Sequence, residues 1–403
     1  MRAIYVDRKL PRMIAVKALR GVWPGVCWSP LGPATVTTLP DPPLPGPRWI
    51  RVKNHQCGIC ATDVSLLLVK VDPSVGPAAL PAYNRFFLGH EVVGTVVEVG
   101  AGAARVKLGE RVIMDTRFHC ANCMSQEIDP PCRFCARGER NLCENVAANV
   151  GPRGIGGGWG DGYTAHETEV YSIPDDISDD LATLVEPMAV GVHAVMRRPP
   201  NPGDKILVLG MGIIGLLTLQ AARAACPDCH VTALARYAHQ AEAARHLGAD
   251  EVIMGTDGYA AVARVAGAKH YAAWMNKGML LGGFDVIYDC VGNGATIEDS
   301  LRWARAGGAV VLVGIDLERV KLDLNSIWYH EVDLIGSKGH GMDEWRGERR
   351  HSYEWVVWWI REGKLTGDGL ITQRFRFEDY RRAVATSLDK RGAKAIKVIF
   401  EYR

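Results

Sequence analysis

The stretch KILVLGMGIIGLL, from Lys205 to Leu217, decides the fold of this chain. Its short apolar run, KILVL, predicts a buried strand, and the apolar residues from Ile213 onward predict a helix. Between them lie Gly210, Gly212 and Gly215. These glycines permit a tight turn, a close approach of the backbone to a pyrophosphate, and close packing of the helix on the strand. In this strand–turn–helix context they predict a dinucleotide-binding site.

Strands and helices alternate after this point. The apolar runs HVTALA, FDVIYDCVG and GAVVLVGI predict further strands, and AHQAEAARHL predicts a helix that ends at Gly248. Apolar strands separated by helices indicate a doubly wound parallel sheet, so we expect a Rossmann-type coenzyme domain over residues 188–336. Within it, the expected cofactor-binding residues are Gly210, Gly212, Ile213, Ile214, Gly215, Ala235, Arg236, His239, Val291, Gly314 and Ser337.

The regions on either side of this expected domain have a different residue composition. Up to about residue 180 the chain is rich in Pro, Gly and β-branched runs such as EVVGTVVEVG and RVIM, which is typical of a β-rich domain with functional loops. After residue 336 we expect a helix around Ser352 to Glu362 and a closing strand, KAIKVIFEY. We assign this tail to the first domain, which then comprises residues 1–187 and 337–403.

Composition and charge narrow the class of partner. The formal charge of +2 on 403 residues gives no electrostatic sign of nucleic-acid binding. The longest apolar run, Ile206 to Ala225, has three glycines in its first half and is better explained as strand, turn and helix than as a membrane span. The N-terminus has no export signal, so a reduced cytoplasm is the expected compartment. We therefore expect a small-molecule partner, without nucleic acid or membrane.

Two short pieces of the first domain suggest metal chemistry: CGICATD (Cys57 to Asp63) and GHEVVG (Gly89 to Gly94). A thiolate, an imidazole and a carboxylate can hold Zn²⁺ and leave one position open, as a catalytic zinc requires. Together with the dinucleotide motif, these pieces resemble the zinc-dependent medium-chain alcohol and polyol dehydrogenases, such as threonine, sorbitol and glucose dehydrogenases. The resemblance covers nearly the whole chain and implies an α/β protein with a GroES-like catalytic domain and a Rossmann domain.

The resemblance assigns roles around the first piece. Cys60 would supply the zinc thiolate and Thr62 a hydroxyl next to the reacting alcohol, with Asp63 supporting the ligands. In many relatives the proton passes from this hydroxyl through the cofactor ribose to a histidine three residues further on, where this chain has Ser65. Ser65 or a water is the expected substitute. Cys57 is a neighbour rather than a ligand.

The second piece supplies His90 as a ligand and Glu91 as a ligand or an outer carboxylate. A later EP dipeptide supplies Glu186 as another carboxylate near the metal. Glu91 and Glu186 are therefore both candidate ligands of the resting zinc.

Five cysteines between Phe118 and Cys143 suggest a second, structural zinc. In a reduced compartment we do not expect them to be cross-linked. CRFCARGERNLC matches the ending of the family's structural-zinc lobe, but Asp129 stands where the family has its first cysteine. The predicted ligands are Cys123, Cys132, Cys135 and Cys143. Cys120 is the second choice for the fourth ligand and Asp129 the third. CPDC, at residues 226–229, lacks a partner pair, and we expect no metal or redox role for it.

The segment HVTALARYAHQ bears on the choice of cofactor. An Asp or Glu normally binds the ribose 2′-hydroxyl of NAD at a position that here falls on Ala235 or, with a slip of one residue, on Leu234. The next residue, Arg236, could pair with a 2′-phosphate, assisted by His239 or Tyr237. We therefore expect NADP to be preferred over NAD.

The parts predict a zinc-dependent oxidoreductase that transfers a hydride between a nicotinamide cofactor and an alcohol or carbonyl substrate. From the resemblance, the substrate is a secondary alcohol, polyol or sugar and the protein a homodimer or homotetramer. The Pro-rich N-terminal segment and a loop around Ala272 to Gly283 are among those expected to line the pocket. One alternative, a zinc-independent quinone or enoyl reductase of the same fold, would not need the predicted ligands. The other, a non-catalytic zinc-binding regulatory protein, would carry a basic surface.

Overall fold

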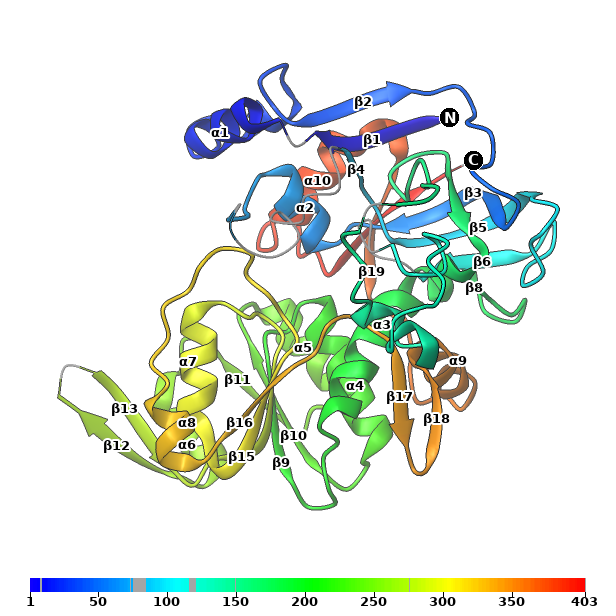
Figure 1. Cartoon of the computed structure of the whole chain (residues 1–403). Helices are drawn as coiled ribbons and strands as arrows, with labels where there is room; N and C mark the ends of the chain where they lie inside the picture. Colours follow the sequence, from blue (N-terminus) through cyan, green and yellow to red (C-terminus); the bar gives the residue numbers. More distant parts are fainter. Residues whose placement is uncertain are drawn as a thin grey trace. The chain divides into compact units, whose positions relative to one another are not determined.

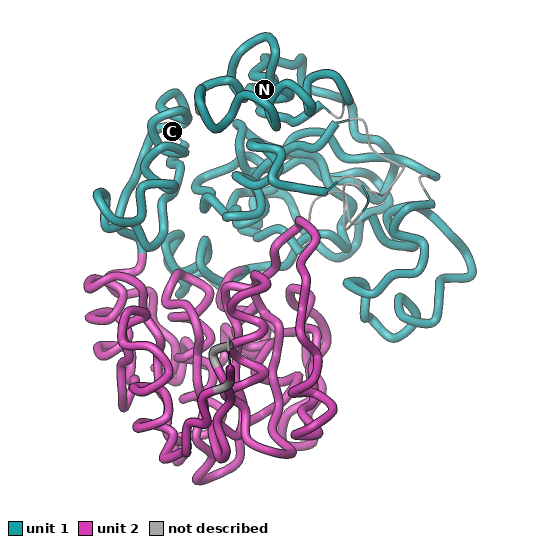
Figure 2. The backbone as a smooth tube through the Cα atoms, turned by 90° about the vertical axis from the view of Figure 1, so that its left-hand side faces the viewer, with its two compact units in different colours: residues 1–186, 371–403 teal, residues 187–370 magenta. Residues whose placement is uncertain are grey.

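The computed structural model describes residues 1–7, 9–72, 74, 85–115, 121–148, 150–274 and 276–402. These residues form two compact units, shown in different colours in Figure 2. The first unit comprises residues 1–186 and 371–403, and the second comprises residues 187–370.

The second unit is built on a six-stranded parallel sheet with the order β11-β10-β9-β14-β15-β16 (Figure 1). From β9 the chain proceeds outward to β11, then crosses to β14 and proceeds outward in the other direction, which is a doubly wound topology. The strands are β9 (Lys205–Leu209), β10 (His230–Ala235), β11 (Glu251–Met254), β14 (Phe284–Asp289), β15 (Ala304–Leu312) and β16 (Asp333–Gly336). The helices between them are α4 (Ile213–Ala225), α5 (Ala238–His246), α6 (Gly258–Ala266), α7 (Gly294–Trp303) and α8 (Asn325–His330). The predicted Rossmann-type fold is confirmed.

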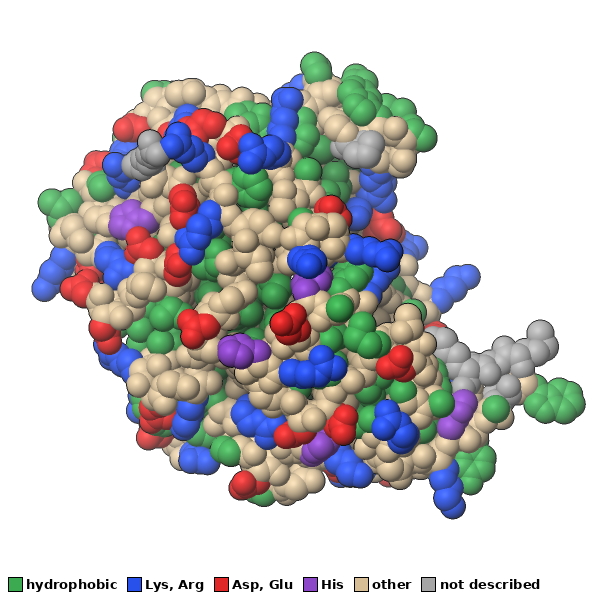
Figure 3. Space-filling view, turned by 180° about the vertical axis from the view of Figure 1, so that it is seen from behind, with side chains coloured by type: hydrophobic (Ala, Val, Ile, Leu, Met, Phe, Trp, Pro, Cys, Tyr) green, Lys and Arg blue, Asp and Glu red, His purple; other side chains and the backbone are tan. Residues whose placement is uncertain are grey.

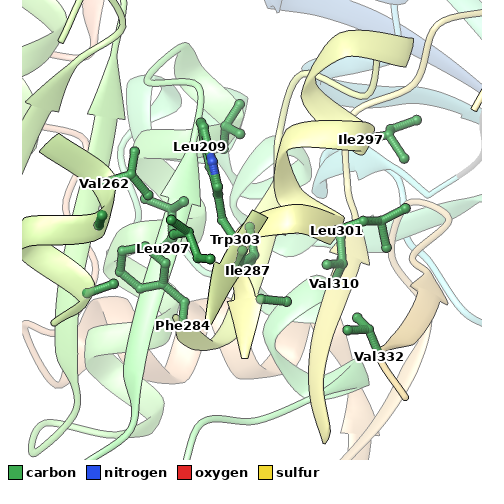
Figure 4. Packing of buried hydrophobic residues seen from close by; sticks show 14 of the residues in the cluster. Leu207, Leu209, Val262, Phe284, Ile287, Ile297, Leu301, Trp303, Val310 and Val332 are labelled. Carbon is green, nitrogen blue, oxygen red and sulfur yellow. The ribbon is translucent and has the colours of Figure 1, made fainter. Parts of the chain in front are cut away.

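The core of this unit explains its apolar strands. Leu207, Ile287 and Val310 come from three neighbouring strands of the sheet, and Leu301 and Trp303 from α7 (Figure 4). All five are buried in one cluster. Strands covered on both faces are apolar along their whole length, which is why they were recognisable in the sequence.

The first unit is β-rich, as predicted. Its main sheet has the order β19-β20-β3-β5-β6-β8, with β7 paired to β3, and a smaller sheet has the order β2-β1-β4. The strands are β1 (Arg2–Asp7), β2 (Ala34–Thr38), β3 (Trp49–Gly58), β4 (Arg85–Phe87), β5 (Glu91–Val99), β6 (Arg111–Met114), β7 (Gly162–His166), β8 (Val170–Ser172), β19 (Ile371–Arg376) and β20 (Lys397–Glu401). The helices are α1 (Leu10–Leu19), α2 (Ala61–Leu67), α10 (Tyr380–Leu388) and the first part of α3 (Asp179–Arg197). Short 3₁₀ turns lie at η1 (Pro24–Trp28), η3 (Cys135–Arg137), η4 (Arg140–Leu142), η5 (Glu167–Glu169) and η6 (Phe377–Asp379). The sequence did not predict α1, which lies in a Pro-rich segment.

Two segments of the second unit differ from the expectation. The predicted loop around Ala272 to Gly283 is a hairpin for most of its length, with β12 (Lys269–Ala273) paired to β13 (Asn276–Leu281). The polar, Gly-containing sequence did not predict these strands, because neither strand has a clear alternation of apolar and polar residues.

Residues 337–370 group with the second unit, whereas the sequence assigned them to the first domain. They form β17 (Met342–Trp345), β18 (Glu348–His351) and α9 (Ser352–Arg361). Polar contacts hold them there: His193 Nδ1 of α3 lies 2.6 Å from Asp343 Oδ1, and the Thr366 N–H donates to Gln220 Oε1 at 2.9 Å. These contacts join residues that are far apart in the sequence, so no local sequence pattern predicts them.

Candidate functional site

The first candidate ligand, Cys60, lies where β3 gives way to α2. Its extended backbone caps the N-terminus of the helix. Its Sγ lies 3.6 Å from Thr62 Oγ1, and both side chains are half-buried. Ser65 follows Thr62 by about one helical turn, so the two hydroxyls lie on one face of α2.

His90 follows a glycine turn that Asp63 holds in place. The Gly89 N–H donates to Asp63 Oδ1 at 2.9 Å, and Asp63 Oδ2 lies 3.6 Å from His90 Nδ1. Gly89 has a φ of +87°, and a Cβ there would lie 2.5 Å from Trp159, so only glycine fits the turn. An imidazole oriented through Nδ1 presents Nε2 as its ligand atom.

Glu91 completes a three-residue cluster. Ligand atoms of Cys60, His90 and Glu91 all lie within 4.8 Å of one another. Gly58 makes room for the carboxylate, since a Cβ at that residue would lie 2.0 Å from Glu91 Oε2. The structure therefore brings a thiol, an imidazole and a carboxyl together in the combination that a catalytic zinc uses.

Lys397, which the sequence analysis missed, pairs with Glu91. Its Nζ lies 2.7 Å and 2.5 Å from the two carboxylate oxygens, and both side chains are only 1% exposed. Burial alone would lower the pKa of Lys397, but the charge of Glu91 raises it, so the lysine stays protonated. The sequence feature that could have identified Lys397 is a lysine within the apolar closing strand IKVIF. Burying an unpaired charge in such a strand would cost free energy, so a buried partner is expected.

Glu186 is buried in α3, and its negative charge contributes to raising the pKa of Glu91, for which burial is the largest cause. Its carboxylate is not part of the three-residue cluster. Burial alone would lower the pKa of His90, yet the negative charges of Asp63 and Cys60 raise it well above its usual value. Such surroundings also favour a divalent cation, which would displace the proton from the imidazole.

A second cluster lies in the cysteine-rich lobe. The sulfur atoms of Cys123, Cys132, Cys135 and Cys143 lie within 4.8 Å of one another. The Sγ atoms of Cys123 and Cys143 are 3.7 Å apart, too far for a disulfide bond. Cys123, nine residues before Cys132, therefore lies in the cluster as predicted, although the family's first cysteine falls on Asp129 in this chain. Four sulfurs at this spacing fit a closed zinc site.

Hydrogen bonds around this cluster favour thiolates. The Cys132 N–H donates to Cys123 Sγ at 3.3 Å, and the Asn145 N–H donates to Cys143 Sγ at 3.3 Å. Asp129 is not part of the cluster. Cys120, the second choice for the fourth ligand, lies outside the described residues.

Of the remaining cysteines, Cys57 is fully buried in β3, and its thiol donates to the Gly58 carbonyl at 3.3 Å. Cys226 and Cys229 are also buried, and the Cys229 thiol donates to the Cys226 carbonyl at 2.9 Å. All three therefore lie within the fold as small buried side chains, outside both clusters.

In the second unit, the glycines after β9 have the geometry of a dinucleotide-binding turn. Gly210 has a φ of +93°. A Cβ at Gly215 would lie 1.8 Å from the Gly210 carbonyl oxygen, so the helix packs against the turn as closely as glycine permits. A Cβ at Gly212 would meet nothing within 4 Å, so this side of the turn is open. Ile213 and Ile214 begin α4, whose N-terminus faces the opening.

The other expected cofactor residues lie at the carboxyl ends of neighbouring parallel strands. Val291 follows β14 and lies beside Gly210, since a Cβ built on that glycine would come within 2.4 Å of Val291 Cγ2. Gly314 follows β15, and Ser337 follows β16. Because the strands are parallel, these ends share one edge of the sheet, where α/β proteins bind their ligands.

The end of β10 carries no carboxylate. Ala235 is fully buried, whereas Arg236 is exposed, with its guanidinium 5.5 Å from the centre of the Tyr237 ring. The Tyr237 ring stacks on His239 at 5.7 Å, with an angle of 8° between the planes. In the described part of the chain, the contact of the Arg236 guanidinium is with the Tyr237 ring and not with an acidic side chain.

Two family models match this chain. The "Alcohol dehydrogenase GroES-like domain" matches residues 46–175, and the "Zinc-binding dehydrogenase" domain matches residues 214–352. The chain belongs to the zinc-type medium-chain dehydrogenase family. The predicted family and its GroES-like and Rossmann-type domains are thereby confirmed.

Curated relatives of this family member are polyol dehydrogenases. The chain is 28% identical over 360 residues to L-idonate 5-dehydrogenase of Vitis vinifera, covering 89% of each protein. It is also 28% identical to sorbitol dehydrogenase of Arabidopsis thaliana, covering 89% of this chain and 90% of the relative. A zinc-binding dehydrogenase structure from Sinorhizobium meliloti, bound to NADP, is 25% identical with a TM-score of 0.68 and covers 92% of this chain and 95% of that chain. Within the described residues, no helix is long and apolar enough to cross a membrane.

Proposed function

We propose that this protein is a zinc- and nicotinamide-dependent dehydrogenase that interconverts a secondary alcohol group of a polyol or sugar with the corresponding carbonyl. The observation that carries the proposal is the cluster of Cys60, His90 and Glu91, which combines three ligand types within reach of one ion. The names of the curated relatives, L-idonate and sorbitol dehydrogenase, support a polyol as the substrate.

The proposed ligands of the catalytic zinc are Cys60, His90 and Glu91, with Glu186 as the nearby carboxylate. When bound, zinc would polarise the substrate oxygen, and the nicotinamide ring would exchange the hydride. Asp63 would keep the His90 ring in one orientation through its contact with Nδ1. Lys397 would hold the Glu91 carboxylate in place and balance its charge.

Thr62 is the proposed proton acceptor. Its hydroxyl lies next to the Cys60 sulfur, so it would be within reach of a substrate hydroxyl at the metal site. Ser65, on the same face of α2, is the proposed next group in the path of the proton toward solvent.

The second proposed metal is a structural zinc held by Cys123, Cys132, Cys135 and Cys143, which makes two zinc ions per chain. Exposure of Trp328 and Tyr329 in α8, at 80% and 60%, supports a homo-oligomer, because large aromatic side chains are seldom left in water. Light scattering of the purified protein tests this part of the proposal.

The proposed cofactor is NADP in preference to NAD. An exposed Arg236 stacked on Tyr237 suits a 2′-phosphate. Because the end of β10 carries no carboxylate, it offers no pair of acceptors for the hydroxyls of a ribose diol. The test is the ratio of kcat/KM for NADP over that for NAD in the wild type and in Arg236→Ala. A wild-type ratio below one, or a ratio that the substitution leaves unchanged, would refute the role of Arg236.

The function itself is tested with a panel of polyols, sugars and simple secondary alcohols, followed by nicotinamide absorbance. We expect turnover of at least one polyol by the wild type and none by Cys60→Ser. Cys57→Ala is the matched control, because it changes a buried cysteine of the same segment that lies outside the cluster. Turnover that survives Cys60→Ser would favour the zinc-independent reductase.

A further inference from the structure

The first unit contains a cavity that borders on the proposed metal ligand His90. Its volume is about 1390 Å³, and all of its described lining residues belong to the first unit. Gly89 and His90 form one part of the wall, and the Pro-rich segment from Leu39 to Pro43 forms another. Sites for small molecules usually measure about 300–1,000 Å³, so this cavity has room for a whole sugar or polyol with a further substituent.

Each acidic side chain that the structure describes in the wall has a partner within the protein. Asp7 lies 3.3 Å from Lys9, and Asp41 lies 3.3 Å from the N-terminal amine. Glu169 accepts a hydrogen bond from the His166 N–H at 3.1 Å, and burial raises the pKa of its carboxyl. The acidic groups therefore add little negative charge to the cavity.

Arg85, at the start of β4, adds a positive charge to the wall that these pairs do not cancel. Asp7 stands opposite it in β1 but is paired with Lys9. The Arg85 guanidinium instead lies 5.1 Å from the centre of the Tyr5 ring. A guanidinium held against a ring keeps the N–H groups at its edge for a planar or tetrahedral anion. Arg153, which is exposed, lines the same cavity and adds a second positive charge.

The chain as a whole has little net charge to attract anions. Its formal charge is +2. Figure 3 shows Lys and Arg side chains interspersed with Asp and Glu over one face of the molecule. A cavity with an excess of one sign of charge concentrates its field on a bound ligand, whereas mixed surface charges largely cancel. Selectivity for an anion would therefore come from the cavity.

We propose that this cavity binds the substrate and that Arg85 and Arg153 bind an anionic group on it, either a carboxylate or a phosphate. The substrate class is then sugar acids or the phosphates of sugars and polyols, rather than neutral polyols. This inference rests on the proposed function, because it takes the carbon to be oxidised to lie at the metal beside His90. Arg85 precedes His90 by five residues, which span at most about 17 Å. A single sugar with its anionic group can therefore reach from the metal to the long Arg85 side chain.

The test is isothermal titration calorimetry of the zinc-loaded protein, which measures binding without turnover. The ligands are neutral hexitols and pentitols, together with the aldonates and the sugar and polyol phosphates of the same carbon chains. The variants are Arg85→Gln, Arg153→Gln and the two combined. The control is Arg382→Gln in α10, which changes a side chain of the first unit that is 73% exposed and is not among the lining residues.

We expect the wild type and the control to bind at least one anionic compound about tenfold or more tightly than the neutral polyol of the same chain. High salt should reduce this preference. Each single variant should weaken binding of that compound about 10- to 100-fold, because hydrogen bonds to charged groups contribute affinity of this order. Tighter binding of the aldonates or of the phosphates identifies which anionic group the arginines hold. Circular dichroism of the variants should match the wild type, since both arginines are exposed.

Three results would overturn the inference. The first is wild-type protein that binds none of the anionic compounds more tightly than the neutral polyols. The second is a preference for the anionic compound that survives in the double variant. The third is inorganic phosphate that binds as tightly as the sugar phosphates, which would indicate a simple anion site rather than a substrate pocket. Failure of the proposed function is a separate result, because it would be seen as missing zinc-dependent turnover, which the binding measurement does not require.

Discussion

Replacing Lys397 by Met removes one charge of the buried pair and keeps a side chain of similar length. Glu91 then stays 1% exposed without the ammonium that lies 2.5 Å away in the wild type. Breaking a buried ion pair by removing one partner costs about 3–5 kcal/mol, because the other charge is left uncompensated. For a unit of this size such a loss lowers Tm by on the order of 10 °C.

The assay is thermal unfolding followed by circular dichroism, on chelator-treated and on zinc-loaded protein. We expect the full loss of stability after chelation and a smaller loss with zinc bound, because a cation at the Cys60 cluster would balance part of the charge of Glu91. Lys364→Met is the matched control: Lys364 lies 2.7 Å from Glu362, but these side chains are 39% and 34% exposed, so the cost should be below about 1 kcal/mol. Adding Glu91→Gln to Lys397→Met should restore part of the stability. A Lys397→Met protein as stable as the Lys364→Met control would refute this reasoning.

Two further predictions concern the second metal and pH. Metal analysis should find two zinc ions per chain in the wild type and one in Cys135→Ser. The variant should also have a lower Tm, because a closed metal site contributes directly to folding. Two zinc ions retained by the variant would mean that the lobe is not a metal site. Burial of His166, assisted by the charge of Arg48, lowers its pKa from 6.5 to about 4, so this residue is protonated more readily in the unfolded chain. Its contribution to stability should be complete above pH 6.5 and should fall by up to about 3 kcal/mol as the pH drops toward 4. Urea unfolding of wild type and His166→Gln at pH 7 and pH 5 measures this, and equal pH dependence in the two proteins would contradict it.

The coenzyme domain could be predicted because its signals are local. The glycines at residues 210, 212 and 215 follow a recognisable apolar strand and begin an apolar helix, so motif and context lie within one short stretch. The cluster of Cys60, His90 and Glu91 was predicted through family resemblance, and its metal binding stays a prediction.

Other features depend on contacts between distant residues. Lys397 is 306 residues from Glu91, and it reaches the carboxylate only because β20 pairs with β3, where Ile399 lies opposite Gly58. No local pattern reveals that register. Helix α1 was missed because prolines and glycines around it suggest a loop, whereas Val16 and Arg20 fix it through contacts with the end of α2.

The central claim is that the metal held by Cys60, His90 and Glu91 is required for alcohol oxidation. The most direct measurement is the initial rate on the best substrate before chelation, after removal of the more accessible metal, and after zinc is returned, in the wild type and in Cys60→Ser. We predict that the wild-type protein loses its activity when the first zinc ion is removed and regains it when zinc is returned. Cys60→Ser should stay inactive throughout. A wild-type rate that persists after the metal has been removed, as verified by metal analysis of the same sample, would contradict the claim.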